Sequence, residues 1–175
     1  MLFRSTVIIM AILLSGCAGV DVSQYREERP ELRLEDYFNG TLDAWGMFQK
    51  RDGTVVKRFK VVIDARWEGD LGTLDERFTY SDGSTQRRVW RVTRTGDDTY
   101  TGRADDVVGI ADGRVSGNSL HWKYTLRLPV EDEVYKVQFD DWMFLQQDGV
   151  MLNRSVMKKF GFRLGEVTLF FKKRS

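Results

Sequence analysis

Cysteine and histidine are nearly absent from this sequence, which holds one of each, Cys17 and His121. A single cysteine cannot close an internal disulfide, and the two residues supply too few donors for a zinc site of the usual ligands. A serine-histidine-aspartate triad would have to use His121, which strand alternation places on a polar face. A carboxylate pair for glycoside hydrolysis depends on a separation in space that the sequence leaves open. We therefore predict no metal, no cofactor and no enzymatic activity.

The sequence also lacks an excess of charge of either sign, with 27 Lys and Arg against 26 Asp and Glu. Residues 1–16 contain Arg4 and no acidic residue, so the chain from Cys17 onward carries 26 of each. A neutral body offers no bulk field for nucleic acid, whose affinity is dominated by phosphate neutralisation, and we predict no nucleic-acid partner. Removing 16 of the 175 residues leaves 159, which fits one domain, expected to be a monomer.

The apolar run Val7–Leu14, preceded by Arg4, is too short for a membrane span of about 20 residues and is typical of a secretory signal. It leads into Leu14-Ser15-Gly16-Cys17, which resembles the lipobox of bacterial lipoproteins. The resemblance implies cleavage before Cys17 and lipid attachment to its sulfur. The alternative is an ordinary signal peptide with an incidental cysteine. Ala18, where an aspartate would retain such proteins at the inner membrane, implies the periplasmic face of the outer membrane of a Gram-negative bacterium.

We divide the chain into a signal peptide (1–16), a lipidated anchor and tether (17–36) and a β-barrel domain (37–175). The tether is predicted because residues 18–30 are polar and Pro30 interrupts any helix there. The segment Leu32–Phe38 is expected to begin the fold, either as a short helical turn or as a first strand.

Tight-turn signals divide the rest of the chain, because Asp-Gly and Gly-Asn pairs supply the positive φ angles of hairpins. These signals lie at Lys50–Gly53, Ser81–Ser84, Ala111–Gly113, Ser116–Asn118 and Gln147–Gly149.

Between the turns, apolar and polar residues alternate with the period of a half-buried strand. One face carries Val55, Phe59, Val61, Ile63, Ala65 and Trp67; another carries Leu120, Trp122, Tyr124, Leu126 and Leu128; a last strand carries Val167, Leu169 and Phe171. Eight to ten such strands with short connections predict an all-β fold, a single antiparallel up-and-down β-barrel. A barrel of this size can hold one small ligand, as lipocalins do. The element Asp43-Ala44-Trp45-Gly46 faintly resembles the Gly-x-Trp of lipocalins, with its glycine on the other side.

A family resemblance runs through five further segments: Leu34–Gly40, Asp105–Ala111, Gly117–Asn118, Asp140–Phe144 and Asn153–Gly161. Together with the lipobox they resemble the signature of a bacterial lipoprotein family, domain-of-unknown-function family 3833, over nearly the whole chain. The resemblance implies no activity.

Four charged residues fall among apolar neighbours at strand period: Glu76, Arg88, Asp141 and Arg154. An unpaired buried charge costs several kcal/mol, so two acids and two bases in one lumen should pair or meet a ligand. One interpretation is a structural ion-pair network at one barrel end. A second is that Arg88 or Arg154 binds the carboxylate or phosphate of a lipid. A third is a one-residue register error, which would reverse each assignment.

The predicted ligand-binding residues are Arg88, Trp90, Trp122, Tyr124, Phe139, Asp141 and Arg154. Two functions follow: a membrane-anchored, lipocalin-like barrel that binds a fatty-acid-like molecule, or an accessory envelope lipoprotein whose barrel is filled by its own aromatic side chains and docks a protein partner.

Overall fold

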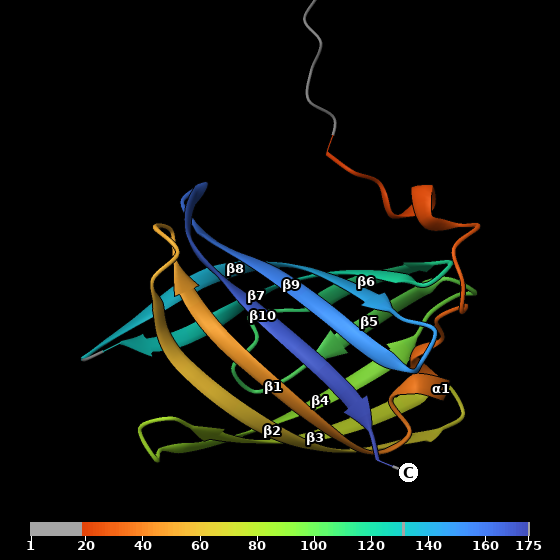
Figure 1. The fold of residues 1–175 in the computed structure, drawn as a ribbon, viewed down its shortest axis with the longest axis horizontal. Helices are drawn as coiled ribbons and strands as arrows, with labels where there is room; N and C mark the ends of the chain where they lie inside the picture. Colours follow the sequence, from red (N-terminus) through yellow and green to blue (C-terminus); the bar gives the residue numbers. More distant parts are fainter. Residues whose placement is uncertain (1–18, 131, 175) are drawn as a thin grey trace, which may run out of the picture.

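Ten antiparallel strands close into one barrel in the computed structural model of this chain, which describes residues 19–130 and 132–174 (Figure 1). Each strand pairs with the next, and β10 returns to β1. This confirms the predicted all-β, up-and-down barrel. The strands are β1 (Gly40–Lys50), β2 (Val55–Glu68), β3 (Leu71–Tyr80), β4 (Thr85–Arg94), β5 (Thr99–Arg103), β6 (Ala111–Ser116), β7 (Ser119–Val130), β8 (Glu133–Leu145), β9 (Val150–Lys159) and β10 (Phe162–Lys173). The predicted signal peptide and Cys17 lie outside the described residues.

Four of the five predicted turns are turns, and Gly53, Gly83, Gly117 and Gly149 all have positive φ there. The prediction of a reversal at Ala111–Gly113 is wrong, because these residues begin β6. A Cβ on Gly113 would lie 2.1 Å from Cε3 of Trp122 on the paired strand β7. Gly113 is therefore required for the close approach of an indole ring inside the barrel, and not for a turn.

The inward faces of the strands follow the predicted alternation on β2, β7 and β10. Val61 and Ile63 are each 1% exposed, whereas Asp64 and Arg66, on the opposite face of β2, are exposed. Leu120, Trp122 and Leu126 are buried in the same interior. Burial of such side chains stabilises the fold by about 1.5–3 kcal/mol each.

One end of the barrel is closed by the helical turn α1 (Leu34–Tyr37), at the right of Figure 1. Leu34 and Phe38 are 4% and 5% exposed, and the indole Nε1 of Trp67 donates to the Phe38 carbonyl at 2.9 Å. The hydroxyl of Tyr100 donates to Glu35 at 2.7 Å. These contacts hold a plug made from the chain that precedes β1.

The segment predicted as a tether packs against the barrel from Val22 onward. Val22, in the 3-10 helix η1 (Val22–Tyr25), is 3% exposed and Leu32 is 1% exposed. The Leu32 N–H donates to the Gly117 carbonyl at 2.8 Å. The fold therefore begins before residue 37. The apolar side chains of Val22 and Leu32, which lie among charged residues in the sequence, hold this polar segment against the barrel. No described helix has the length and apolar character needed to cross a membrane.

The short strands β5 and β6 leave β4 and β7 apart over part of their length, and the loop at residues 104–110 lies beside β7 there. Val107 forms an isolated bridge with Leu126, and the Arg127 N–H donates to the Asp106 carbonyl at 2.8 Å. This pairing places the Asp106 side chain within reach of Arg88 on β4.

Candidate functional site

The barrel encloses a cavity of about 1090 Å³ that runs from α1 towards the turns at the opposite end. Leu34, Phe38 and Phe171 line its closed end, and all three are buried. At the other end the lining includes Ser84 and Thr85, which are exposed. The cavity therefore opens at the end that carries the β1–β2, β3–β4 and β9–β10 turns, at the left of Figure 1.

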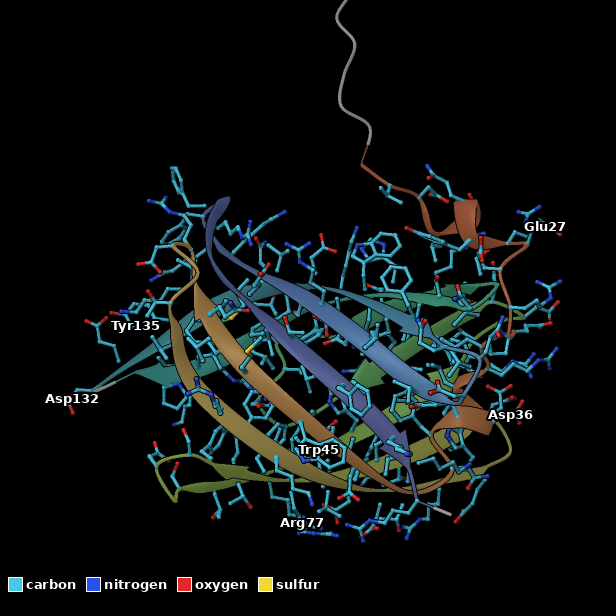
Figure 2. All side chains as sticks on the ribbon, in the orientation of Figure 1. Glu27, Asp36, Trp45, Arg77, Asp132 and Tyr135 are labelled. Atoms are coloured by element: carbon cyan, nitrogen blue, oxygen red, sulfur yellow. The ribbon has the colours of Figure 1, made fainter. Side chains whose placement is uncertain are left out.

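Three cationic side chains line the cavity towards this mouth. The Lys57 ammonium lies 3.0 Å from Asp82, the Lys159 ammonium lies 3.7 Å from the centre of the Tyr135 ring, and Arg127 donates to the Asp105 carbonyl. Figure 2 shows Tyr135 at the mouth end and Asp36 at the closed end. Exposed apolar side chains stand beside the mouth, since Phe160 and Phe162 on the β9–β10 hairpin are 86% and 73% exposed.

Aromatic rings form one wall of the cavity. Trp90 contacts Trp122 and Tyr124 edge-to-face, with ring centroids 5.8 and 5.4 Å apart, and Tyr124 stacks on Phe139 at 5.1 Å. All four residues were predicted from strand alternation, and the structure brings them together on β4, β7 and β8. They offer a broad apolar surface to a ligand.

Arg88 and Glu76 were both expected to face the lumen and do so, each with a side chain 13% exposed. The guanidinium of Arg88 makes a two-pronged contact with Asp106, with Nε and the terminal nitrogen donating at 2.9 and 2.7 Å. Its other terminal nitrogen lies 3.8 Å from the Glu76 carboxylate. Burial raises the pKa of Glu76 to about 7 even though the nearby Arg88 charge acts in the opposite direction.

Asp141, also predicted, is 5% exposed on the lumen side of β8. Its carboxylate accepts hydrogen bonds from the Ser155 hydroxyl and, at 3.2 Å, from the Tyr124 hydroxyl. Burial raises the pKa of Asp141 to about 7, and the two hydrogen bonds only partly offset that effect. The cluster of Glu76, Arg88, Asp106 and Asp141 thus contains three carboxyl groups and one guanidinium.

Arg154 does not face the cavity, and the expectation that it does is wrong. Its side chain is 64% exposed and binds Glu166 on the outer surface at 2.9 Å. On β9 the inward residues are Met151, Asn153, Ser155 and Met157, all buried, while Leu152 is 45% exposed. The apolar side chains beside Arg154 therefore lie outside with it, and no Asp141–Arg154 pair is formed.

Two residues at this site were not singled out in the sequence: Asp106, a member of the cluster, and Ser155, which donates to Asp141. Asp106 lies in a loop without strand alternation, so no periodic signal marks it. Ser155 is identified by pairing: it lies opposite Val167, which was correctly placed inside. Opposite residues in an antiparallel pair share a face.

His121 faces the outer surface of β7, as predicted, but it is not freely solvated. Its ring stacks on Trp142 with centroids 4.0 Å apart, and Nε2 lies 2.6 Å from Asp140, leaving the side chain 16% exposed. Among the described residues, no three His, Cys, Asp or Glu side chains gather in a way that could hold a metal ion.

The model of a family described as "Protein of unknown function (DUF3833)" matches residues 11–173 of this chain. No curated protein matches the chain.

Proposed function

This chain belongs to the DUF3833 family, and we propose that it is a non-enzymatic binding protein that holds the acyl chain or other apolar part of a lipid in its barrel. The single observation that carries the proposal is the cavity of about 1090 Å³, closed at one end by α1 and open at the other. Ligand pockets of proteins are mostly apolar clefts of about 300–1,000 Å³ with a few polar groups, and this cavity has that composition and a volume just above that range.

The hollow lumen counts against the alternative of a barrel filled by its own aromatic residues. Trp90, Trp122, Tyr124 and Phe139 line a cavity that is still about 1090 Å³ in volume, and Trp122 lies flat over neighbouring strands. Gly102 and Gly113 allow this for Trp122, because a Cβ at either position would lie within 2.5 Å of the indole. The exposed Phe160 and Phe162 beside the mouth support uptake of the ligand from an apolar surface.

A bulky side chain that fills part of the lumen should weaken ligand binding. Val167 lines the cavity on β10 and is partly exposed to it, so Val167→Trp would occupy space needed by a ligand. We expect at least about tenfold weaker binding of a neutral apolar dye, N-phenylnaphthylamine, measured by dye fluorescence. Thr168→Trp is the matched control, since Thr168 is the next residue on the same strand and pairs with the outward-facing Arg154. Equal dye affinity in Val167→Trp and wild type, with both proteins folded, would reject the cavity as the binding site.

We further propose that the barrel is held at the periplasmic face of an outer membrane by lipid on Cys17. The support is the sequence Leu14-Ser15-Gly16-Cys17, in which the cysteine is the only one of the chain. Two or more acyl chains are needed for stable anchoring, because each buried methylene contributes about 0.8 kcal/mol.

Cys17→Ala should remove the anchor. We expect the variant to lose the lipid mass and to remain uncleaved or appear in the soluble periplasmic fraction, as judged by fractionation and mass spectrometry. A Cys17→Ala protein that stays in the outer membrane with the mass of the mature wild type would contradict the proposal. Ser15→Ala is a control that leaves a small residue before the cysteine and should change neither result.

A further inference from the structure

We propose that the part of the ligand at the middle of the cavity donates hydrogen bonds and carries no negative charge, so that the barrel selects an alcohol or ammonium lipid over a fatty-acid anion. The inference rests on the proposed function and names the ligand class of the same cavity. It replaces the expectation that Arg88 binds a carboxylate.

Arg88 is already engaged by the protein. Its Nε and one terminal nitrogen donate to Asp106, and its other terminal nitrogen faces Glu76. A ligand carboxylate would have to displace Asp106, whose backbone is itself paired with Arg127 beside β7. Such a displacement would leave the partly buried Asp106 carboxylate without its cation, which costs more than the new contact returns.

The other ionisable groups of the cluster around Arg88 are carboxyl groups. Because the charges of Arg88 and Asp106 neutralise each other, no full positive charge remains to balance the carboxyl groups of Glu76 and Asp141. Both carboxyl groups line the cavity. Burial disfavours the negative charge of both groups and raises the pKa of each to about 7. A third anion close to them would add repulsion in a poorly solvated space.

A wholly apolar chain does not satisfy these groups either. Methylene groups packed over Glu76 and Asp141 would remove water from carboxyl oxygens and supply no donor in exchange. A hydroxyl or ammonium group at that depth would donate to them while the rest of the molecule lies against the aromatic wall. The lumen therefore favours an apolar molecule with a donor group.

A fatty acid could bind in a second way, with its anionic head group beside the cations at the mouth and only its tail inside the cavity. Lys57 is paired with Asp82 and Lys159 lies over Tyr135, so each already has a favourable partner. A fatty acid bound in that way would not require the lumen carboxyl groups.

The test compares dodecanol, dodecylammonium and dodecanoate, which share a chain and differ in the head group, as competitors of N-phenylnaphthylamine on the full chain. Energy transfer from tryptophan to the dye reports occupancy of the lumen, because Trp90 and Trp122 line it. At about pH 8, above the pKa of both carboxyl groups, dodecanol and dodecylammonium should displace the dye at concentrations at least about tenfold lower than dodecanoate.

Three variants locate the cause. Glu76→Gln and Asp141→Asn should each reduce the preference to about threefold or less by improving dodecanoate binding. Asp75→Asn, on the outward face of β3 where Asp75 pairs with Arg87, should leave the preference unchanged. If one of the two lumen variants does not fold, the other is enough to test whether the lumen carboxyl groups cause the preference.

Dodecanoate that binds as tightly as dodecanol would overturn the inference and leave the proposed function standing. The same holds for a preference that neither lumen variant changes. Failure of the dye and of all three competitors to bind would reject the proposed function itself.

Discussion

Arg88→Met should lower the free energy of unfolding by about 3–5 kcal/mol, because it leaves the partly buried Asp106 and Glu76 carboxyl groups without their cation. Methionine keeps an unbranched apolar stem, so the loss is chiefly that of charge and hydrogen bonds and not of packing. The effect should be measured by urea unfolding followed by circular dichroism.

The matched control is Arg154→Met, the same substitution on the outer surface. Arg154 also contacts a carboxylate through two nitrogens, but its side chain is 64% exposed. Exposed ion pairs contribute about 0–1 kcal/mol, so this variant should be close to wild type. Equal losses in the two variants would contradict the assignment of Arg88 to a buried cluster.

The double variant Arg88→Met/Asp106→Asn separates charge from shape. Removing both partners of a buried pair is far less costly than removing one, so the double variant should be more stable than Arg88→Met alone. Additive losses would show that the two side chains do not act as a pair.

The sequence was sufficient to predict the inward faces of most strands, because alternation of period two reports directly which side chains are buried. Glu76, Arg88 and Asp141 stood out against that pattern, and all three line the cavity. Their exact partners depend on which strands become neighbours, so the Arg88–Asp106 contact could not be obtained from alternation alone.

The error at Arg154 comes from the composition of β9 itself. Its outward face carries the apolar Leu152 and Val156 beside Arg154, whereas its lumen face includes the polar Asn153 and Ser155. Alternation takes the more apolar face as the buried one, so in β9 it favoured the wrong face. The pairing of strands decides the face instead: Ser155 lies opposite the inward-facing Val167.

The second large effect expected is a loss of stability as the pH rises from about 5 to about 7. In the folded protein burial raises the pKa of Glu76 and of Asp141 to about 7, from ordinary values of 4.5 and 3.8. Below pH 4 the carboxyl groups are largely protonated in both states. Between about pH 4 and pH 7 the unfolded chain releases these protons while the folded barrel retains them, so stability falls with pH and levels off above about pH 7.

Between pH 5 and pH 7 each group costs up to about 1.4 kcal/mol of stability per pH unit, and less as the pH approaches its folded pKa, so the two groups together lose on the order of 3–5 kcal/mol over these two units. Asp43 and Asp82, whose pKa values are lowered to about 2 by hydrogen bonds from Arg174 and Ser84 respectively, titrate below this range and do not obscure it.

Glu76→Gln and Asp141→Asn should each remove part of the slope of stability against pH, because an amide stays neutral at every pH. Urea unfolding of wild type, both variants and the outward control Asp75→Asn at half-unit intervals from about pH 5 to pH 8 would measure it. A wild-type stability that is flat or rises over this range would show that the two carboxyl groups are not held protonated by the lumen. A slope that persists in both variants would place its origin elsewhere in the protein.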